Sequence, residues 1–347
     1  MQNANRVVHC CESEYRMVTI FDIAREAGVS VVTVSRLMNN PKIVSTRTAE
    51  KILKAMEKFH YQPSQIARSL VGKRTNTIGV IMPDIKNTFF NSWFRFIEEY
   101  ANSHGFNLLL SNTDDDPDKE MRCIKLLQSQ RVDGVIIAAH ARSSVEYLLK
   151  TKMRFILFDR VYNGMPGDFV TTDHYHGAFI ATEYLINLGH KKIAIYHGPG
   201  VLYPDIERTA GFRDAMKKHH VKIEESLVLN CEFEEEKARK ATLELMKRKE
   251  KPTAIFPFNG LMSKGVIKAL RESNLSIPDD LSLLSFDEIP GQDIFTPAIT
   301  HVIQPINTLG KDVILALIEK IKMPETLKKV RIVSKPKLII GDSCKKL

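Results

Sequence analysis

The stretch "VTIFDIAREAGVSVVTVSRLMNN", residues 18–40, decides the fold of the N-terminal part of this chain. Thr19 and Asp22 have the spacing of a capping box, which predicts that a helix begins here, and Gly28 ends it. Ser30 can cap a second helix that follows at once. Two short helices joined by a tight, glycine-containing turn indicate a helix-turn-helix unit.

The second helix of this unit has an inward and an outward face. Val34 and Leu37 recur at helical spacing and are expected inside. The outward face then holds Val31, Val32, Thr33 and Arg36. The alternative is that Val31 and Val32 are ordinary core residues. We favour the outward position, because Val34 and Leu37 already fill the inward face.

A third helix is expected from near Ser45 to about His60. Its apolar stripe consists of Ile52, Leu53, Met56 and Phe59. Three short helices in succession complete the helix-turn-helix plan.

Charge is unevenly distributed along the 347 residues, whose net charge is +9. Residues 1–75 contain 12 Lys or Arg and 6 Asp or Glu, whereas the rest of the chain has 38 and 35. A basic end on a nearly neutral body favours a polyanionic partner such as nucleic acid. A merely soluble basic surface remains the alternative.

Other features of the composition exclude several classes of protein. The five cysteines have neither metal-ligand nor disulfide-framework spacing, which fits a reducing cytoplasm, and no metal or cofactor is expected. No apolar run has the length of a membrane span, and the first residues lack the apolar core of a signal peptide. Residues 1–17 have no periodicity and are expected to form a disordered extension, with an upstream start ahead of Met17.

Beyond the linker, short apolar runs alternate with helical patterns. The runs that predict strands are "TIGVIM", "FNLLLS", "DGVIIAA", "RFILFD", "KIAIYHG", "TAIFPF", "LSLLSFD", "VRIVS" and "KLIIG". The helical patterns include residues 117–130, 175–188, 206–219, 234–249, 260–272 and 306–322. This alternation predicts doubly wound, parallel α/β sheets, and about 270 residues suffice for two lobes.

Taken together, these segments resemble the LacI/GalR family of bacterial transcription regulators. The most specific matches are the stretch quoted first, "YQPSQIARSL", "IGVIMPDIKNTFF", "GHKKIAIYHG", "RTAGFRDAM" and "IPDDLSLLSFDEIP". The stretches around "PDIKNTFF" and "LLSNTDDDPDKE" look most like the branch of the catabolite control protein.

The resemblance implies an all-α helix-turn-helix head, a hinge helix, and an α/β core similar to periplasmic sugar-binding proteins. The chain of such a core crosses three times between two doubly wound lobes. The implied domains are a disordered extension at 1–17, the head at 18–62, the hinge helix at 63–75, and an effector-binding and dimerisation core at 76–347. The implied lobes are about 76–172 with 305–332 for the first, and about 173–304 with 333–347 for the second.

For the DNA contacts, the resemblance places the main base-reading side chains at Val31, Val32 and Arg36. Arg36 can bond a guanine through two hydrogen bonds, and the valines suit thymine methyl groups. Ser30 and Thr33 suit phosphate contacts or helix capping. In the hinge, Leu70 matches a leucine that wedges into the minor groove, the alternative being a plain linker contact. The implied DNA-binding set is Thr19, Ser30, Val31, Val32, Thr33, Arg36, Asn39, Arg68, Ser69 and Leu70.

For the ligand, polar residues at strand ends suit the hydroxyl groups of a sugar. By resemblance, the ligand-binding set is Phe90, Asp159, Arg160, Arg208, Asn259, Asp287 and Gln304, with Phe89 and His140 as further candidates. Any one carboxylate alone could equally cap a helix or a turn. Arg208, helped by Arg160 and His140, would accept an acidic or phosphorylated sugar.

The function expected is a homodimeric repressor of sugar-utilisation genes that binds a two-fold operator in double-stranded DNA and responds to a small sugar-type effector. Induction or corepression, and a protein corepressor, are left open. The competing class is an enzyme on the α/β core, with Asp159 and Asp287 as a glycosidase pair. The sequence has no Gly-x-Gly-x-x-Gly, phosphate-loop or Gly-x-Ser-x-Gly motif to support an enzyme.

Overall fold

The computed structural model describes residues 18–39, 41–61, 74–162, 167–289, 291, 294, 296–323 and 329–347. The chain divides after Thr75 into an N-terminal head and a core, which are described separately. The expected extension at 1–17 and nearly all of the expected hinge at 63–75 lie outside the described residues.

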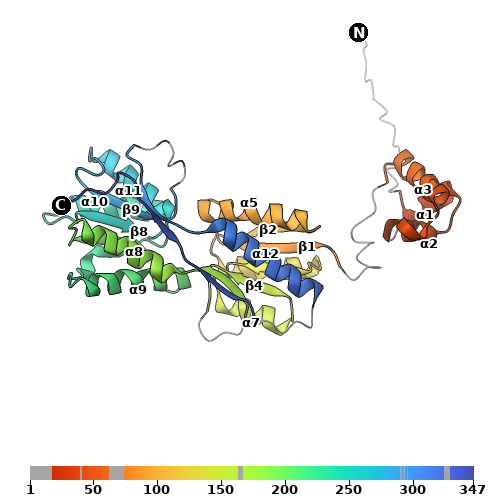
Figure 1. The fold of residues 1–347 in the computed structure, drawn as a ribbon, viewed down its shortest axis with the longest axis horizontal. Coiled ribbons are helices and arrows are strands. Elements are labelled where there is room, and N and C mark those ends of the chain that lie inside the picture. Colours follow the sequence, from red (N-terminus) through yellow and green to blue (C-terminus); the bar gives the residue numbers. More distant parts are fainter. Residues whose placement is uncertain are drawn as a thin grey trace, which may run out of the picture. The chain divides into compact units, whose positions relative to one another are not determined.

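The described part of the head contains three α-helices in the order expected of a helix-turn-helix unit (Figure 1). They are α1 (Ile20–Ala27), α2 (Val31–Asn39) and α3 (Thr46–Lys58), with a short 3-10 turn at Pro41–Ile43. Asp22 Oδ2 accepts hydrogen bonds from Thr19 N at 3.0 Å and from Thr19 Oγ1 at 2.7 Å, which closes the start of α1. Gly28 ends α1 with a φ of 65°, a conformation that glycine adopts without steric cost.

The core of the head is small and is built from all three helices. Its buried members are Ile23, Ala24, Ala27, Val34, Leu37, Ile52 and Ala55. The prediction for Leu53 was wrong, since its side chain is 56% exposed. On α3 the inward face runs through Ile52 and Ala55, and Leu53 lies about 100° around the helix from Ile52.

The core unit contains two sheets of six strands, each belonging to one lobe. The first lobe has the strand order β11-β5-β4-β3-β1-β2 and the second β12-β10-β9-β8-β6-β7. The strands of the first are β1 (Thr77–Met82), β2 (Asn107–Asn112), β3 (Gly134–Ile137), β4 (Phe155–Phe158), β5 (Phe169–Thr172) and β11 (Arg331–Ser334). Those of the second are β6 (Ile193–His197), β7 (Val228–Asn230), β8 (Ala254–Pro257), β9 (Ser282–Phe286), β10 (Thr300–Ile303) and β12 (Lys337–Ile339).

Helices cover both faces of each sheet, as a doubly wound fold requires (Figure 1). In the first lobe, α5 and α12 build the apolar core on one face, and α6 and α7 build that on the other. The core helices are α5 (Thr88–Ser103), α6 (Pro117–Ser129), α7 (Arg142–Lys150), α8 (His174–Asn187), α9 (Tyr203–Lys218), α10 (Glu235–Met246), α11 (Gly260–Glu272) and α12 (Ile306–Lys322).

The chain passes between the lobes three times. It leaves the first sheet after β5 and enters the second lobe with α8, and it returns between β10 and α12. The last passage joins β11 of the first sheet to β12 of the second. These closely spaced passages hold the two lobes side by side.

One strand pairing differs from a purely parallel plan. β12 pairs with β10 in the antiparallel sense, whereas the other pairings are parallel. The strands β5, β7 and β10 were not expected, because each has only three or four residues and includes polar ones.

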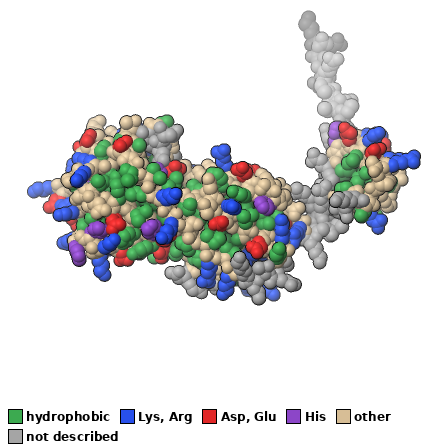
Figure 2. All heavy atoms as spheres, viewed as in Figure 1, with side chains coloured by type: hydrophobic (Ala, Val, Ile, Leu, Met, Phe, Trp, Pro, Cys, Tyr) green, Lys and Arg blue, Asp and Glu red, His purple; other side chains and the backbone are tan. Residues whose placement is uncertain are grey.

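Lys, Arg, Asp and Glu side chains are interspersed over the visible face of the core (Figure 2). Among the described helices, none has the length and apolar character to cross a membrane.

Candidate functional site

The α2 helix presents an exposed apolar side chain and an exposed guanidinium one turn apart. Val32 is 59% exposed, and Arg36 is exposed four residues later on the same face. Ser30 caps the helix, since its Oγ accepts a hydrogen bond from Thr33 N at 3.2 Å and lies 2.9 Å from Thr33 Oγ1. This end of α2 can therefore enter the major groove with Val32 and Arg36 foremost.

The remaining residues of the expected DNA-binding set differ from Val32 and Arg36 in exposure and contacts, or lie outside the described residues. Val31 is half-buried and packs against the core of the head, so only part of its side chain faces outward, in contrast to the expectation. Thr19 is exposed beside the start of α1, with its hydroxyl bonded to Asp22. The side chain of Asn39 lies outside the described residues, as do Arg68, Ser69 and Leu70.

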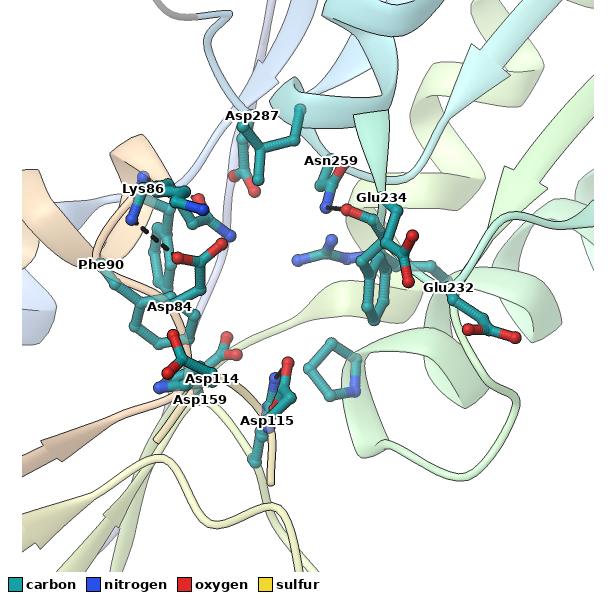
Figure 3. Close-up of a pocket in the computed structure, with 18 residues that line it drawn as sticks. Asp84, Lys86, Phe90, Asp114, Asp115, Asp159, Glu232, Glu234, Asn259 and Asp287 are labelled. Carbon is teal, nitrogen blue, oxygen red and sulfur yellow. Dashed lines mark hydrogen bonds and ion pairs between the residues drawn. The ribbon is translucent and has the colours of Figure 1, made fainter. Parts of the chain in front are cut away.

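A cavity of about 280 Å³ lies between the lobes of the core (Figure 3). In Figure 3, Phe90 and Asp159 lie on one side of it and Asn259 and Glu234 on the other. The lining side chains come from loops at the carboxyl ends of strands in both sheets, where ligands bind in α/β folds, and from the N-terminal turns of the helices α5, α9 and α11. They are Pro83, Asp84, Lys86, Asn87, Phe89, Phe90, Asp114, Asp115, Asp159, Arg160, Pro204, Arg208, Glu232, Phe233, Glu234, Asn259, Leu261 and Asp287.

Asp159 and Asp287 occupy equivalent places in the two lobes. Each directly follows the third strand of its sheet order, β4 or β9, and each is left-handed, with φ of 62° and 67°. The backbone N of each donates to the neighbouring strand, Asp159 to Val170 O at 3.0 Å and Asp287 to Val302 O at 2.9 Å. Aspartate tolerates this conformation better than most residues. The fold thus aims one carboxylate from each sheet at the cavity.

Asp159 belongs to a buried polar chain that reaches the second lobe. His174 Nε2 lies 3.1 Å from Asp159 Oδ1, and Arg208 Nη2 lies 3.2 Å from His174 Nδ1. Burial acts to raise the pKa of Asp159, but the contact with His174 and the charges of Arg208 and Arg160 outweigh it and hold the pKa below its ordinary value. Asp159 is therefore ionised at neutral pH.

Besides His174, two further groups hold Arg208. It donates from Nη1 to the carbonyl of Phe258, and its guanidinium stacks at 3.7 Å over the ring of Phe286. Burial lowers its pKa against the opposing effect of Asp287, Asp159 and Asp205. Arg208 Nε and Asp159 Oδ1 are buried atoms without a hydrogen-bond partner in the described part of the chain, the 3.1 Å approach of His174 lacking the alignment of a hydrogen bond.

Gln304 does not line the main cavity, in contrast to the expectation. It lies behind Asp287, where its Nε2 donates to Asp287 Oδ1 at 2.7 Å and its Oε1 accepts from Thr172 Oγ1 at 2.5 Å. Both ends of its amide are thereby used inside the protein. Burial raises the pKa of Asp287 to about 6, against the effects of Arg208 and Gln304.

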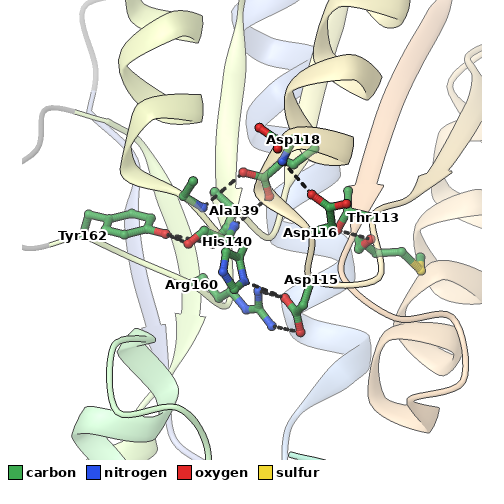
Figure 4. A network of polar contacts seen from close by, with 11 residues as sticks. Thr113, Asp115, Asp116, Asp118, Ala139, His140, Arg160 and Tyr162 are labelled. Atoms are coloured by element: carbon green, nitrogen blue, oxygen red, sulfur yellow. Dashed lines mark hydrogen bonds and ion pairs between the residues drawn. The ribbon is translucent and has the colours of Figure 1, made fainter. Parts of the chain in front are cut away.

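Arg160 and His140 converge on Asp115 (Figure 4). Arg160 donates to both carboxylate oxygens of Asp115, at 2.5 and 3.1 Å, and His140 Nδ1 lies 3.1 Å from Asp115 Oδ1. Burial acts to raise the pKa of Asp115, yet the charge of Arg160 and the contact with His140 keep it far below the ordinary value. Arg160 lines the cavity, whereas His140 does not.

The remaining predicted residues, Asn259, Phe90 and Phe89, all line the cavity. Asn259 also caps α11, because its Oδ1 accepts from Met262 N at 2.8 Å, while its Nδ2 donates to Phe233 O at 3.2 Å. Phe90 packs edge-on against Phe89, with ring centroids 5.0 Å apart. These aromatic rings give the first lobe an apolar wall beside the carboxylates.

Several lining residues were not expected from the sequence. Most are charged and lie in loops after strands: Asp84, Lys86, Asp114, Asp115, Glu232 and Glu234. The three consecutive aspartates at 114–116 follow the strand β2, and this position at a strand end could have predicted them as residues of the site. The loop at 232–234 follows the short strand β7, which was itself not expected.

A helix-turn-helix head joined to a two-lobed core with a cavity between its lobes defines an effector-responsive, DNA-binding regulator. Residues 19–64 match the family of bacterial regulatory proteins, lacI family, and residues 75–339 match the periplasmic binding proteins and sugar binding domain of LacI family. The chain belongs to the LacI family and is a DNA-binding transcription regulator.

Individual relatives agree with this family. The chain is 36% identical over 299 residues to the HTH-type transcriptional regulator DegA of Bacillus subtilis (strain 168), covering 85% of this chain and 88% of DegA. It is 34% identical over 315 residues to catabolite control protein A of Priestia megaterium, covering 89% and 94%. The solved transcriptional regulator CelR-cellobiose complex superposes with a TM-score of 0.71 at 26% identity, covering 94% of this chain and 99% of that one.

Proposed function

We propose that this protein represses sugar-utilisation genes as a homodimer on a two-fold operator, and that a small sugar-type effector bound between the lobes controls it. The observation that carries the effector site is the pair of buried atoms lacking hydrogen bonds in the described structure, Asp159 Oδ1 and Arg208 Nε. Both residues line the cavity, and one is an acceptor and the other a donor. A sugar hydroxyl can serve both, because it donates and accepts.

The charge of the cavity favours an uncharged or cationic ligand over an anionic one. Seven carboxylates and three cationic side chains are among the lining residues, a formal balance of −4. Arg160 is already paired with Asp115, and Arg208 with Phe258 O and His174. A phosphate would therefore meet more negative charge than free positive charge, so the acidic or phosphorylated sugar that the arginines alone suggested is not favoured.

On DNA, Val32 and Arg36 of each head would read base edges, with Ser30 and Thr33 placing the head on the backbone. One small head offers few contacts, so two heads on a two-fold site are the expected arrangement. Leu70, with Arg68 and Ser69, would enter the minor groove in the hinge. Because its target is chromosomal DNA, the protein would act in the cytoplasm.

A glycosidase is the competing function, and one observation favours considering it. The pKa of Asp287 is raised to about 6 while that of Asp159 is lowered, and paired carboxylates in acid–base catalysis differ in this way. Both carboxylates face internal partners, Gln304 and His174, which also suits binding without turnover. Incubation with aryl glycosides of common sugars separates the two, since an enzyme releases the aryl group.

The experiment that tests the proposal has two stages. Selection of the full-length protein against a random duplex library should enrich a two-fold site. Thermal-shift screening of neutral sugars, amino sugars and sugar phosphates should then give a ligand that raises the melting temperature and changes affinity for that site. Enrichment without symmetry would contradict the dimer, and stabilisation by phosphorylated sugars alone would contradict the effector class.

A further inference from the structure

The histidine at the first passage between the lobes makes contacts that the proposed function does not use. His174 is the first residue of α8, directly after the chain leaves β5, and it is 1% exposed. Its Nε2 faces Asp159 at the end of β4 in the first lobe, and its Nδ1 faces Arg208 on α9 in the second. One buried ring thus stands between two residues that line the cavity from opposite lobes.

The partners of the ring determine where its proton lies. An arginine guanidinium can only donate hydrogen bonds, so the 3.2 Å contact with Arg208 Nη2 requires a free lone pair on His174 Nδ1. The proton of the neutral ring is then on Nε2, which faces Asp159 Oδ1 at 3.1 Å in an electrostatic contact that lacks the alignment of a hydrogen bond. We propose that His174 is a positioning residue that couples Asp159 of the first lobe to Arg208 of the second through its neutral, Nε2-protonated ring.

The surroundings of the ring support the neutral form. On α9 it faces Arg208 and the phenol ring of Tyr203, with ring centroids 6.0 Å apart. On the sheet side it faces Asp159, Phe286 at 6.0 Å between centroids, and Thr171 Oγ1, which lies 3.5 Å from Nε2. Asp287 and Asp205 act electrostatically on Arg208, the cation that faces the ring. Burial and Arg208 lower the pKa of His174, although Asp159 acts in the opposite direction.

Protonation would disrupt this coupling from one side. A proton on Nδ1 would place an N–H against the N–H of Arg208, while the contact with Asp159 would become an ion pair. Arg208 would lose its histidine acceptor and Asp159 would keep its partner. Acidification is therefore expected to uncouple the second lobe from the first, below the ordinary histidine pKa of about 6.5.

A double-mutant cycle tests the coupling without any ligand. Urea unfolding midpoints of the full-length protein would be measured for Asp159→Asn, Arg208→Met and the double variant at pH 7.5. The same set would be made in the His174→Leu background, with His176→Leu, a half-buried histidine two residues along α8, as the matched control. We expect non-additive midpoint shifts in the wild-type and His176→Leu backgrounds and additive ones in His174→Leu. Equal non-additivity in both histidine backgrounds, or additivity in the wild type, would overturn the proposal.

A second measurement needs only the wild-type chain, in case His174→Leu does not fold. Long-range nitrogen–proton correlation spectra identify the protonated ring nitrogen of a histidine, here assigned through its backbone connectivity. The expected result is a ring protonated on Nε2 alone at pH 7.5 that gains its second proton only below pH 6.5. Protonation on Nδ1, or a charged ring at pH 7.5, would overturn the proposal.

Only the regulatory meaning of this coupling rests on the proposed function. Both measurements use the protein without effector, so they can succeed when every sugar fails to bind. Conversely, a sugar could bind both the wild type and His174→Gln and change the DNA affinity of both equally. This result would support the effector site but contradict the coupling role of His174.

Discussion

Asp159 and Asp287 are structural counterparts, each in a left-handed conformation directly after the third strand of its sheet order. Their environments nevertheless push their pKa values in opposite directions. His174 and the two arginines lower that of Asp159, whereas burial raises that of Asp287 to about 6. The two lobes thus offer the same geometry with different charge, and an asymmetric ligand can distinguish them.

Replacing Asp287 with Asn is expected to stabilise the ligand-free protein at neutral pH. A carboxyl whose folded pKa lies above its unfolded value of 3.8 stabilises the fold at low pH, and this contribution is lost as pH rises through about 6. The variant keeps an acceptor for Gln304 and removes the buried charge. The free energy of unfolding of Asp287→Asn should exceed that of the wild type by an amount that grows between pH 4 and pH 7 to about 1–3 kcal/mol. Urea unfolding of both proteins across this range measures it, and a constant difference would contradict the assignment.

Arg36→Ala should weaken binding to the selected operator and relax the preference at one base pair. The exposed guanidinium on α2 is placed to bond a guanine, a contact that provides about 1–3 kcal/mol of discrimination. Fluorescence anisotropy with operator and scrambled duplexes measures this loss. Arg25→Ala on α1, which removes a side chain that is 78% exposed, is the charge-matched control. Equal losses on both duplexes would show that Arg36 contacts phosphate instead.

Leu70→Ala should reduce the bend in the operator more than it reduces binding to non-specific DNA. A minor-groove wedge contributes through kinking of the duplex, whose cost is offset by contacts made on the bent form. Energy transfer between dyes at the two ends of the operator reports the bend. The control is Val71→Ala, which shortens the neighbouring apolar side chain of the same linker. If Leu70→Ala left the bend unchanged, Leu70 would be a plain linker contact and not a minor-groove wedge.

The effector cavity should discriminate against negative charge. For the sugar that binds best, the 6-phosphate is expected to bind at least about tenfold more weakly, equivalent to about 1.4 kcal/mol. Neutralising two lining carboxylates in Asp84→Asn, Glu234→Gln should narrow this ratio, because less negative charge then faces the phosphate. Calorimetric titrations of both ligands give the ratio. Tighter binding of the phosphate to the wild type would refute the charge argument.

Much of the fold follows from local pattern. The capping residues at Thr19 and Ser30 and the glycine turn at Gly28 specify the head, because each acts on its own helix end. In the core, the long apolar strands were visible as continuous runs. By contrast, β5 and β10 have four residues each, with threonine in both, and derive their stability from the neighbouring strands.

The residues of the site also fall into two groups, those that the sequence could predict and those that only the folded structure shows. Asp159 and Asp287 could be placed from the strands that precede them, and both line the cavity. Gln304 also follows a strand, yet Thr172 and Asp287 use its amide, and only the packed structure shows such partners. The same holds for His174, since nothing in its local sequence indicates that Asp159 and Arg208 meet there.

The central claim is that the cleft between the lobes controls the DNA-binding head. Its most direct test is operator affinity with and without the effector found by screening, for wild type, Asp159→Asn and Arg208→Met. We predict that effector changes the affinity of the wild type by about tenfold or more, within the usual range of allosteric coupling, while both variants bind operator normally and respond weakly. Variants that respond like the wild type at the same effector concentrations would contradict control through this cleft.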